Sequence, residues 1–99
     1  MTALLTREQV SDALSDLPLW SGDTSGITST HEFPSFPEAI VGVAAVGALA
    51  ERLDHHPDMD IRWRSVTFAV ATHSEGGVTA KDIELAAGID RVIGRQTPQ

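Results

Sequence analysis

The sequence predicts an α+β fold, a two-layer sandwich in which helices pack on one face of a four-stranded antiparallel sheet. Segments with helical and strand periodicity follow one another in the order helix, strand, strand, helix, strand, strand, helix, without a βαβ repeat. Several connections have the character of hairpins, which favours antiparallel pairing. A chain of 99 residues has room for one core, so we expect a single domain over residues 1–99.

The N-terminal third is expected to form one helix and one hairpin. Thr6-Arg7-Glu8-Gln9 has the form of a capping box, and apolar residues follow at helical spacing, which predicts a helix over about 7–16. Leu19-Trp20 begins an extended piece that stops at the turn-forming run Ser21-Gly22-Asp23. The Thr-, Ser- and Ile-rich segment 26–33 would be the second strand of this hairpin.

A central helix is expected over about 36–54, with Ser35 as its N-cap. From Ala39 to Ala50 it is apolar on nearly every side, so it must be covered on more than one face. The run is about a dozen residues, whereas a membrane span needs roughly 20. We therefore predict a buried helix, and its small residues indicate a helix-mediated subunit contact: Gly42, Ala44, Ala45, Gly47 and Ala48.

The C-terminal half is expected to contain two strands and a helix. A short strand covers 58–61 and a longer one 62–72, whose alternation directs Val66, Phe68 and Val70 toward the helices and places His73 on the opposite face. After a turn over 74–77, Thr79 and Asp82 cap a helix that runs to about Gly94. Its apolar residues spread beyond one stripe, which again indicates a subunit interface.

Composition excludes several classes of protein. Cysteine is absent, so disulfides, thiolate metal sites and cysteine nucleophiles are excluded. The net charge is −7 and Lys and Arg do not cluster, so we expect neither nucleic acid nor an anionic membrane as partner. The N-terminus lacks the pattern of an export signal, and we expect a cytoplasmic protein that binds a small neutral ligand or a protein.

Three of the four histidines lie at junctions between predicted elements. Glu51 and His55 are four residues apart at a helix end, so the carboxylate can orient the imidazole. Pro57 forces His56 to splay away, and His73 arrives at a strand end. Because imidazole exchanges protons near neutral pH, such a cluster can hold one proton donor and one acceptor, as elimination of water requires.

Each of these features also has a structural interpretation. Adjacent histidines at a helix exit are commonly a solvated C-cap, and Asp82 suits a helix N-terminus. Thr72 and His73 precede a glycine-containing turn, a position that suits a structural role as well as a functional one. His31 is an even number of positions from Ile27 and Phe33, so it lies on the same face of its strand as these core-facing residues, and we interpret it as structural. We interpret Trp20 as part of the core.

Taken together, the spacing Glu51-x3-His55-His56-Pro57-x5-Trp63-x9-His73-x8-Asp82 resembles the signature of the pterin-4a-carbinolamine dehydratases, also called 4a-hydroxytetrahydrobiopterin dehydratases. The resemblance extends upstream through Leu17-Pro18-Leu19-Trp20 and Phe33-x2-Phe36-x2-Ala39. It covers the chain from about residue 10 to about residue 90.

The resemblance implies a hydro-lyase that dehydrates a 4a-hydroxytetrahydropterin to the quinonoid dihydropterin in tetrahydropterin recycling, without metal or organic cofactor. It implies that His55 and His73 are the general acid and base and that His56 contributes to binding and catalysis. It places Asp54, Thr72 and Ser74 along the pterin pocket, with Glu51 and Asp82 supporting the histidines. It also implies a homodimer or homotetramer and a pathway with a pterin-dependent hydroxylase.

The chain departs from the family pattern at four positions. Met59 and Trp63 stand where Trp and Tyr are usual, and we expect them to affect pocket shape and substrate preference. Ser29 and His31 replace Arg and Phe. Two alternatives remain open: a non-catalytic relative that binds proteins, as coactivators and assembly chaperones of the family do, and a metal site whose ligands are His55, His56 and His73.

Overall fold

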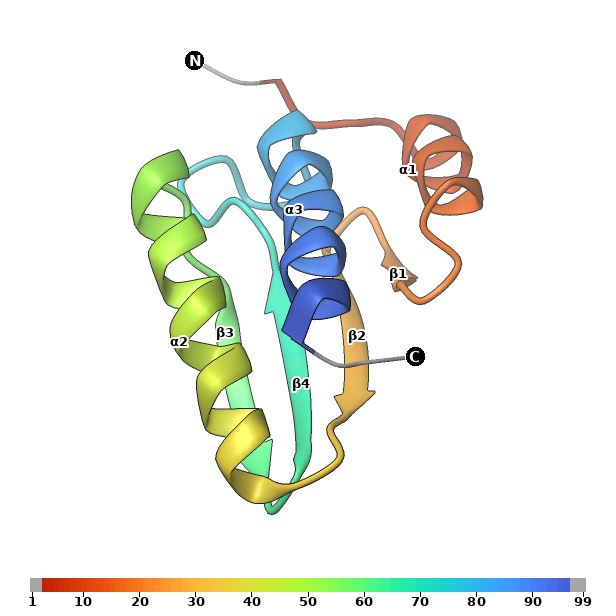
Figure 1. The fold of residues 1–99 in the computed structure, drawn as a ribbon. Helices are drawn as coiled ribbons and strands as arrows, with labels where there is room; N and C mark the ends of the chain where they lie inside the picture. The colour runs from red at the N-terminus through yellow and green to blue at the C-terminus, as the bar shows by residue number, and fades with distance from the viewer. Residues whose placement is uncertain (1–2, 97–99) are drawn as a thin grey trace.

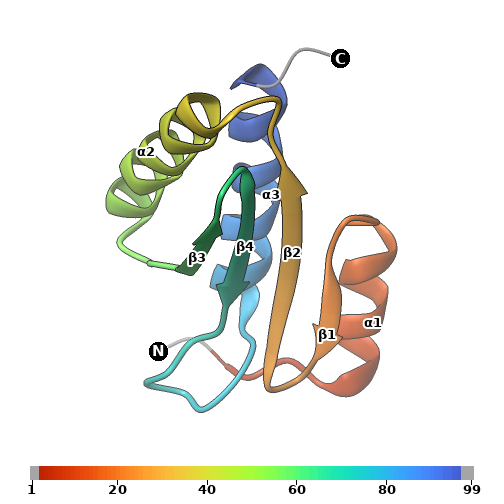
Figure 2. The ribbon, with the colours of Figure 1, turned by 90° about the horizontal axis from the view of Figure 1, so that it is seen from below.

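One antiparallel sheet with the strand order β1-β2-β4-β3 forms the first layer, and helices form the second (Figure 1). The computed structural model describes residues 3–96. Helices α2 and α3 cover one face of the sheet, whereas α1 lies beside β1 at its edge (Figure 2). This architecture confirms the predicted fold class. The elements are α1 Arg7–Ser15, β1 Ser21–Asp23, β2 Gly26–Glu32, α2 Phe36–Leu53, β3 Asp58–Arg62, β4 Ser65–Val70 and α3 Ala80–Gln96.

The predicted helix starts are confirmed by their caps. Thr6 forms the reciprocal capping box with Gln9 at the start of α1. The hydroxyl of Ser35 accepts the backbone N–H of Glu38 at the start of α2. These local side-chain acceptors satisfy backbone donors that have no partner within the helix.

Two strand predictions were wrong in their bounds. The first strand begins only at Ser21, because Leu17 to Trp20 form a turn closed by a hydrogen bond from the Trp20 N–H to the Leu17 carbonyl. The predicted long strand over 62–72 is divided: β3 continues to Arg62, and Trp63 has a left-handed φ of 54° in the turn before β4. This hairpin turn lacks the Asn-Gly or Asp-Gly pair that would have indicated it.

The core lies between the sheet and the two helices. Val66, Phe68 and Val70 of β4 are buried on the helix side, as the alternation predicted. The apolar residues of α3 are covered within the chain, so their wide distribution does not require a subunit interface. The fully or almost fully buried apolar residues of α3 are Leu85, Ala86, Ile89 and Ile93.

His31 and Trp20 pack in this core region, as predicted. The Trp20 indole Nε1–H donates to Asp90 Oδ1 at 2.9 Å. His31 contacts the ring of Phe33 edge-on, and its Nε2 is buried without a hydrogen-bond partner in the described part of the chain. Burial lowers the pKa of His31, and the nearby Asp90 carboxylate opposes that shift.

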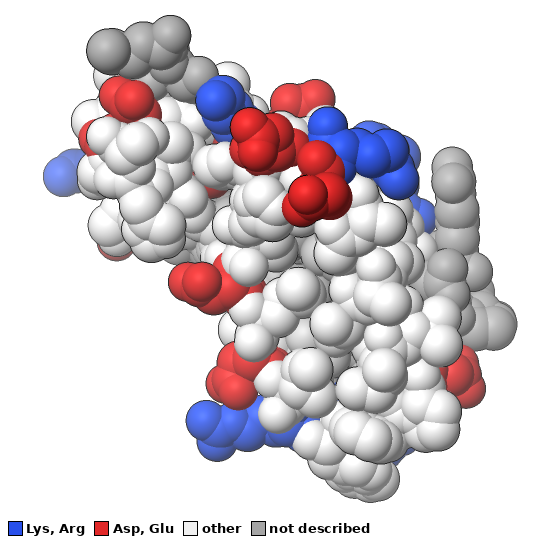
Figure 3. Space-filling model, turned by 90° about the vertical axis from the view of Figure 1, so that its left-hand side faces the viewer, with Lys and Arg blue, Asp and Glu red and all other residues white. Residues whose placement is uncertain are grey.

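Helix α2 is only partly covered, which differs from the expectation of a buried helix. Ala39, Val46 and Leu49 face the core, whereas Ile40 and Val41 are 41% and 52% exposed. Figure 3 views the molecule from the side of α2, where a broad area carries no charged side chain. None of the helices among residues 3–96 is long and apolar enough to cross a membrane.

Candidate functional site

The end of α2 determines where the two adjacent histidines point. Asp54 adopts a left-handed conformation with φ 51°, and its N–H donates to the carbonyl of Glu51. The N–H of His55 reaches back to the carbonyl of Ala50 at 3.1 Å. This αL turn satisfies the last helical carbonyls and reverses the chain direction. Consequently, His55 and His56 leave the helix on different sides.

His55 is held by a buried carboxylate. Its Nε2 lies 2.5 Å from Oδ1 of Asp82, which is completely buried in the first turn of α3. Oδ2 of Asp82 accepts the hydroxyl of Thr72 and the backbone N–H of Thr79, both at 2.8 Å. The Thr72 proton is used in this bond, so Thr79 donates its own hydroxyl to Thr72. The carboxylate is therefore fully hydrogen-bonded and fixes the imidazole.

His56 is paired with Glu51 instead. Its Nε2 lies 2.9 Å from Oε1 of Glu51, and both side chains are exposed. The predicted pairing of Glu51 with His55 was wrong, because the helical spacing rule no longer applies after the left-handed residue Asp54. An exposed pair of this kind contributes about 1 kcal/mol or less, so it orients His56 only weakly.

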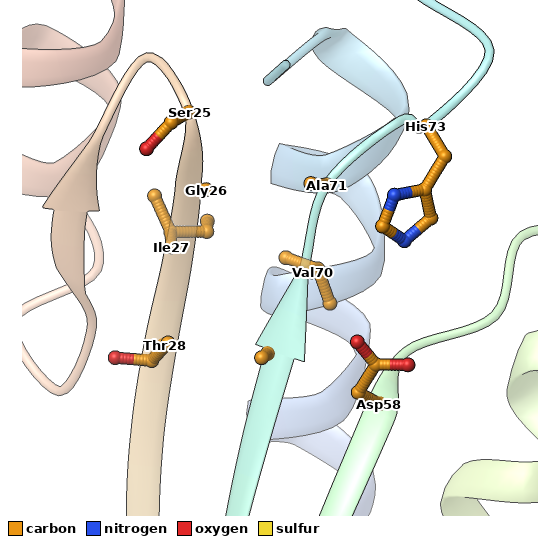
Figure 4. A pocket seen from close by; sticks show the side chains of 9 residues that line it. Ser25, Gly26, Ile27, Thr28, Asp58, Val70, Ala71 and His73 are labelled. Atoms are coloured by element: carbon orange, nitrogen blue, oxygen red, sulfur yellow. The ribbon is translucent and has the colours of Figure 1, made fainter. Parts of the chain in front are cut away.

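His73 lies at a hollow on the face of the sheet opposite α2 and α3. This hollow has a volume of about 160 Å³ and is lined by residues 25–28, Asp58, residues 69–71 and His73 (Figure 4). Sequence reasoning did not identify Asp58, which follows the histidine pair by two residues. Only the sheet register, in which Asp58 and Thr28 both lie opposite Ala69, brings it beside residues of β2 and β4.

The remaining predicted pocket residues have different surroundings. Asp54 and Ser74 are exposed, whereas Thr72 is 6% exposed and its hydroxyl is used by Asp82. Thr72 thus supports His55 rather than lining the hollow. Thr79 belongs to the same hydrogen-bond network around Asp82. Its position as a predicted helix cap was the feature of the sequence that could have identified it.

Met59 and Trp63 lie away from the hollow. Met59 packs against the hydrophobic core, opposite Phe68 in the sheet. Trp63 is 70% exposed at the β3–β4 turn, under the guanidinium of Arg64. Figure 1 shows this turn at one end of the β3–β4 hairpin. The hollow lies at the other end, where β3 begins at Asp58 and β4 ends at Val70, so the expected effect of Trp63 on this hollow is not supported.

The histidines do not converge on a common point that would suit a metal ion. His55 and His56 are bound to different carboxylates, and no group of three His, Cys, Asp or Glu side chains within residues 3–96 is arranged to hold a metal. The alternative of a three-histidine metal site therefore finds no geometric support.

Two bacterial relatives are similar over almost their whole length. A protein of Nocardia farcinica is 52% identical over 91 residues, which cover 92% of this chain and 96% of the relative. A protein of Roseiflexus castenholzii is 48% identical over 93 residues, with coverage of 94% and 100%. Both carry the provisional name pterin-4-alpha-carbinolamine dehydratase.

One solved structure supports the same relationship, and a second one supports the fold. A Brucella melitensis protein described as a transcriptional coactivator/pterin dehydratase matches with a TM-score of 0.86 and 35% identity, covering 91% of this chain and 98% of its own. A pterin dehydratase-like protein described as a RuBisCO assembly factor of the α-carboxysome matches with a TM-score of 0.63 and 20% identity, covering 76% and 87%. The second match concerns the fold alone. Because the family model for pterin 4 alpha carbinolamine dehydratase matches residues 3–92, the chain belongs to this family.

Proposed function

We propose that the protein is a hydro-lyase that dehydrates a 4a-hydroxytetrahydropterin to the quinonoid dihydropterin. The observation that carries this proposal is the pairing of His55 with the buried Asp82, together with family membership. A carboxylate that fixes an imidazole is a recurrent way to prepare a residue for proton transfer. The proposed reaction requires neither a metal nor an organic cofactor.

The reaction breaks the bond between C4a and the hydroxyl oxygen and forms a double bond between C4a and N5. The leaving hydroxyl takes up a proton, and N5 loses one, so the products are the quinonoid pterin and water. Expelling hydroxide without protonation is unfavourable, and positioned acids and bases typically accelerate such steps by about 10²–10⁴-fold.

We assign the base to His55 and the acid to His73. When Nε2–H of neutral His55 donates to Asp82, Nδ1 retains its lone pair and can accept the N5 proton. The side chain of His73 is exposed and its ring forms no hydrogen bond with the described residues, so it is free to donate to the hydroxyl oxygen. His56 would contribute to binding, with Glu51 as its weak support.

A stopped-flow assay with synthetic 4a-hydroxytetrahydropterin tests this function. The wild type should accelerate dehydration well above the spontaneous rate, whereas His55→Ala and His73→Ala should each remove most of the acceleration. Equal rates for the wild type and the double variant would contradict the proposal. Circular dichroism of each variant serves as the control for folding.

The second candidate is a protein-binding role without catalysis. The exposed apolar side chains of α2, Ile40 and Val41, favour it, because surfaces of this kind bind other proteins. The coactivator description of the Brucella melitensis relative points in the same direction. A wild type that fails to accelerate dehydration but retains its fold would favour this candidate.

The same α2 surface supports self-association as a dimer or tetramer. Ala44 and Ala48 are exposed one and two turns after Ile40, and their small side chains permit close approach of another helix. Sedimentation of the wild type should give an oligomer, and Ile40→Glu should shift it toward the monomer. The proposed setting is cytoplasmic pterin recycling beside a pterin-dependent hydroxylase.

A further inference from the structure

The hollow on the open face of the sheet contains an acidic group to which the proposed reaction assigns no role. Asp58 is the first residue of β3, and its carboxylate borders the hollow that His73 also lines. Figure 4 shows the carboxylate and the imidazole ring pointing toward one another from β3 and from the segment after β4. Neither side chain has a hydrogen-bond or ion-pair partner among residues 3–96.

Small residues create the space beside Asp58. In the sheet register Ala69 lies between Asp58 and Thr28, so three strands contribute one row across this face. A Cβ placed on Gly26 would be in ordinary contact with the Val70 carbonyl oxygen at 3.5 Å and with the Cβ of Ala71 at 3.8 Å, so the hydrogen side chain of Gly26 leaves room there for about one methyl group. Most residues that line the hollow are small or apolar, which suits contact with the face of a ring system.

Hydrogen-bonding groups in this hollow are few. The Ser25 hydroxyl is bonded to the carboxylate of Asp23, so it is already engaged. Among the described residues that line the hollow, Asp58 is the only one with a carboxylate, and none is Lys or Arg. A ligand that fits here should therefore present hydrogen-bond donors, not acceptors, toward β3.

The pyrimidine ring of a pterin presents such donors. Its 2-amino group and its N3–H lie side by side on one edge, and together they match the two oxygens of a carboxylate, as the fork of a guanidinium does. A ligand that donates both bonds in this fixed geometry replaces two separate water molecules on the carboxylate, and hydrogen bonds to a charged acceptor are stronger than those between neutral groups.

We propose that Asp58 binds the 2-amino group and N3–H of the pterin and thereby positions its C4a hydroxyl beside His73. This inference rests on the proposed dehydratase function and adds a residue that determines substrate specificity. Asp58 does not transfer a proton in the reaction. Its contribution is to ligand affinity and orientation, so it should act mainly on KM and on the discrimination between ring systems.

Binding of two stable ligands to the full chain tests the proposal. One is a dihydropterin, and the other is the matching dihydrolumazine, which has a carbonyl oxygen in place of the 2-amino group. The wild type should prefer the pterin. Asp58→Asn should weaken pterin binding by about 10- to 100-fold and abolish the preference, because the amide can donate to the lumazine carbonyl.

Asp60→Asn is the matched control. Asp60 lies on the same strand and the same face as Asp58, and its substitution by Asn removes the same charge. Within residues 3–96 its carboxylate pairs with Arg62, outside the hollow. It should keep the affinity and the pterin preference of the wild type. Equal losses in both variants would indicate a general charge effect and would overturn the assignment.

Kinetics separate this proposal from the proposed function. Asp58→Asn should raise KM while kcat changes by less than about threefold. A lower kcat with an unchanged KM and a shifted pH profile would show that Asp58 acts through His73, which overturns the inference alone. An unchanged preference in an active Asp58→Asn variant would do the same. A wild type that neither binds pterin nor dehydrates it would overturn both proposals.

Discussion

Nε2 of His55 and Oδ1 of Asp82 lie 2.5 Å apart, although the two residues are 27 positions apart in the sequence. The contact joins the C-terminal end of α2 to the first turn of α3. Because Asp82 is completely buried and both of its oxygens are hydrogen-bonded, the imidazole is held by a rigid group rather than by a mobile surface side chain.

Asp82→Asn should lower kcat by about 10²–10⁴-fold and destabilise the fold by about 1–3 kcal/mol. The amide has one acceptor where the carboxylate has two, so its NH₂ group must face either His55 or the donors of Thr72 and Thr79. Steady-state kinetics and urea unfolding measure the two effects. The exposed Asp60→Asn variant is the control, and a fully active Asp82→Asn variant would contradict the role of the buried carboxylate.

His73→Gln should lower kcat by about 10²–10⁴-fold without changing the melting temperature, because the exposed imidazole has no partner in the described chain. His56→Gln should lower kcat less, since its exposed contact with Glu51 orients it only weakly. Parallel assays of the two variants check this order. A larger loss for His56→Gln would require the roles of the two histidines to be exchanged.

Ala69→Leu should weaken pterin binding by at least about tenfold, because a larger side chain would fill the row between Asp58 and Thr28. The side chain points to the open face, so stability should change little. Thr67→Leu is the control, since Thr67 lies on the same strand and face but outside the hollow. Fluorescence titration with a dihydropterin measures both, and equal binding to both variants would exclude the hollow as the pterin site.

His31 should make stability depend on pH. Burial lowers its pKa, so between the ordinary value of 6.5 and the lower folded value the unfolded chain binds more protons than the folded chain. The contribution of neutral His31 to the free energy of unfolding is therefore fully present above pH 6.5, and it is lost as the pH falls through the pKa that His31 has in the folded chain.

The variant His31→Phe keeps a ring beside Phe33 but cannot titrate. Between about pH 8 and about pH 5, the unfolding free energy of the wild type should fall more than that of the variant. Urea denaturation at each pH measures this difference. Parallel pH dependences would show that His31 is not the responsible group.

The sequence by itself determined the fold class, the order of the elements and the helix starts. These features depend on local chemistry: Thr6 and Ser35 cap helices through neighbouring backbone groups, and the alternation of Val66, Phe68 and Val70 identifies a half-buried strand. The turn at Trp63 was missed because its residues carry no turn signal.

Only the tertiary structure decided the partners of the site residues. Helical spacing predicted that Glu51 pairs with His55. Because Asp54 adopts a left-handed conformation, Glu51 instead pairs with His56, and His55 contacts Asp82. Asp58 became part of a hollow through the register of β3 against β4. Spacing describes contacts within one element, whereas contacts between elements depend on how helices and strands pack, which local patterns do not encode.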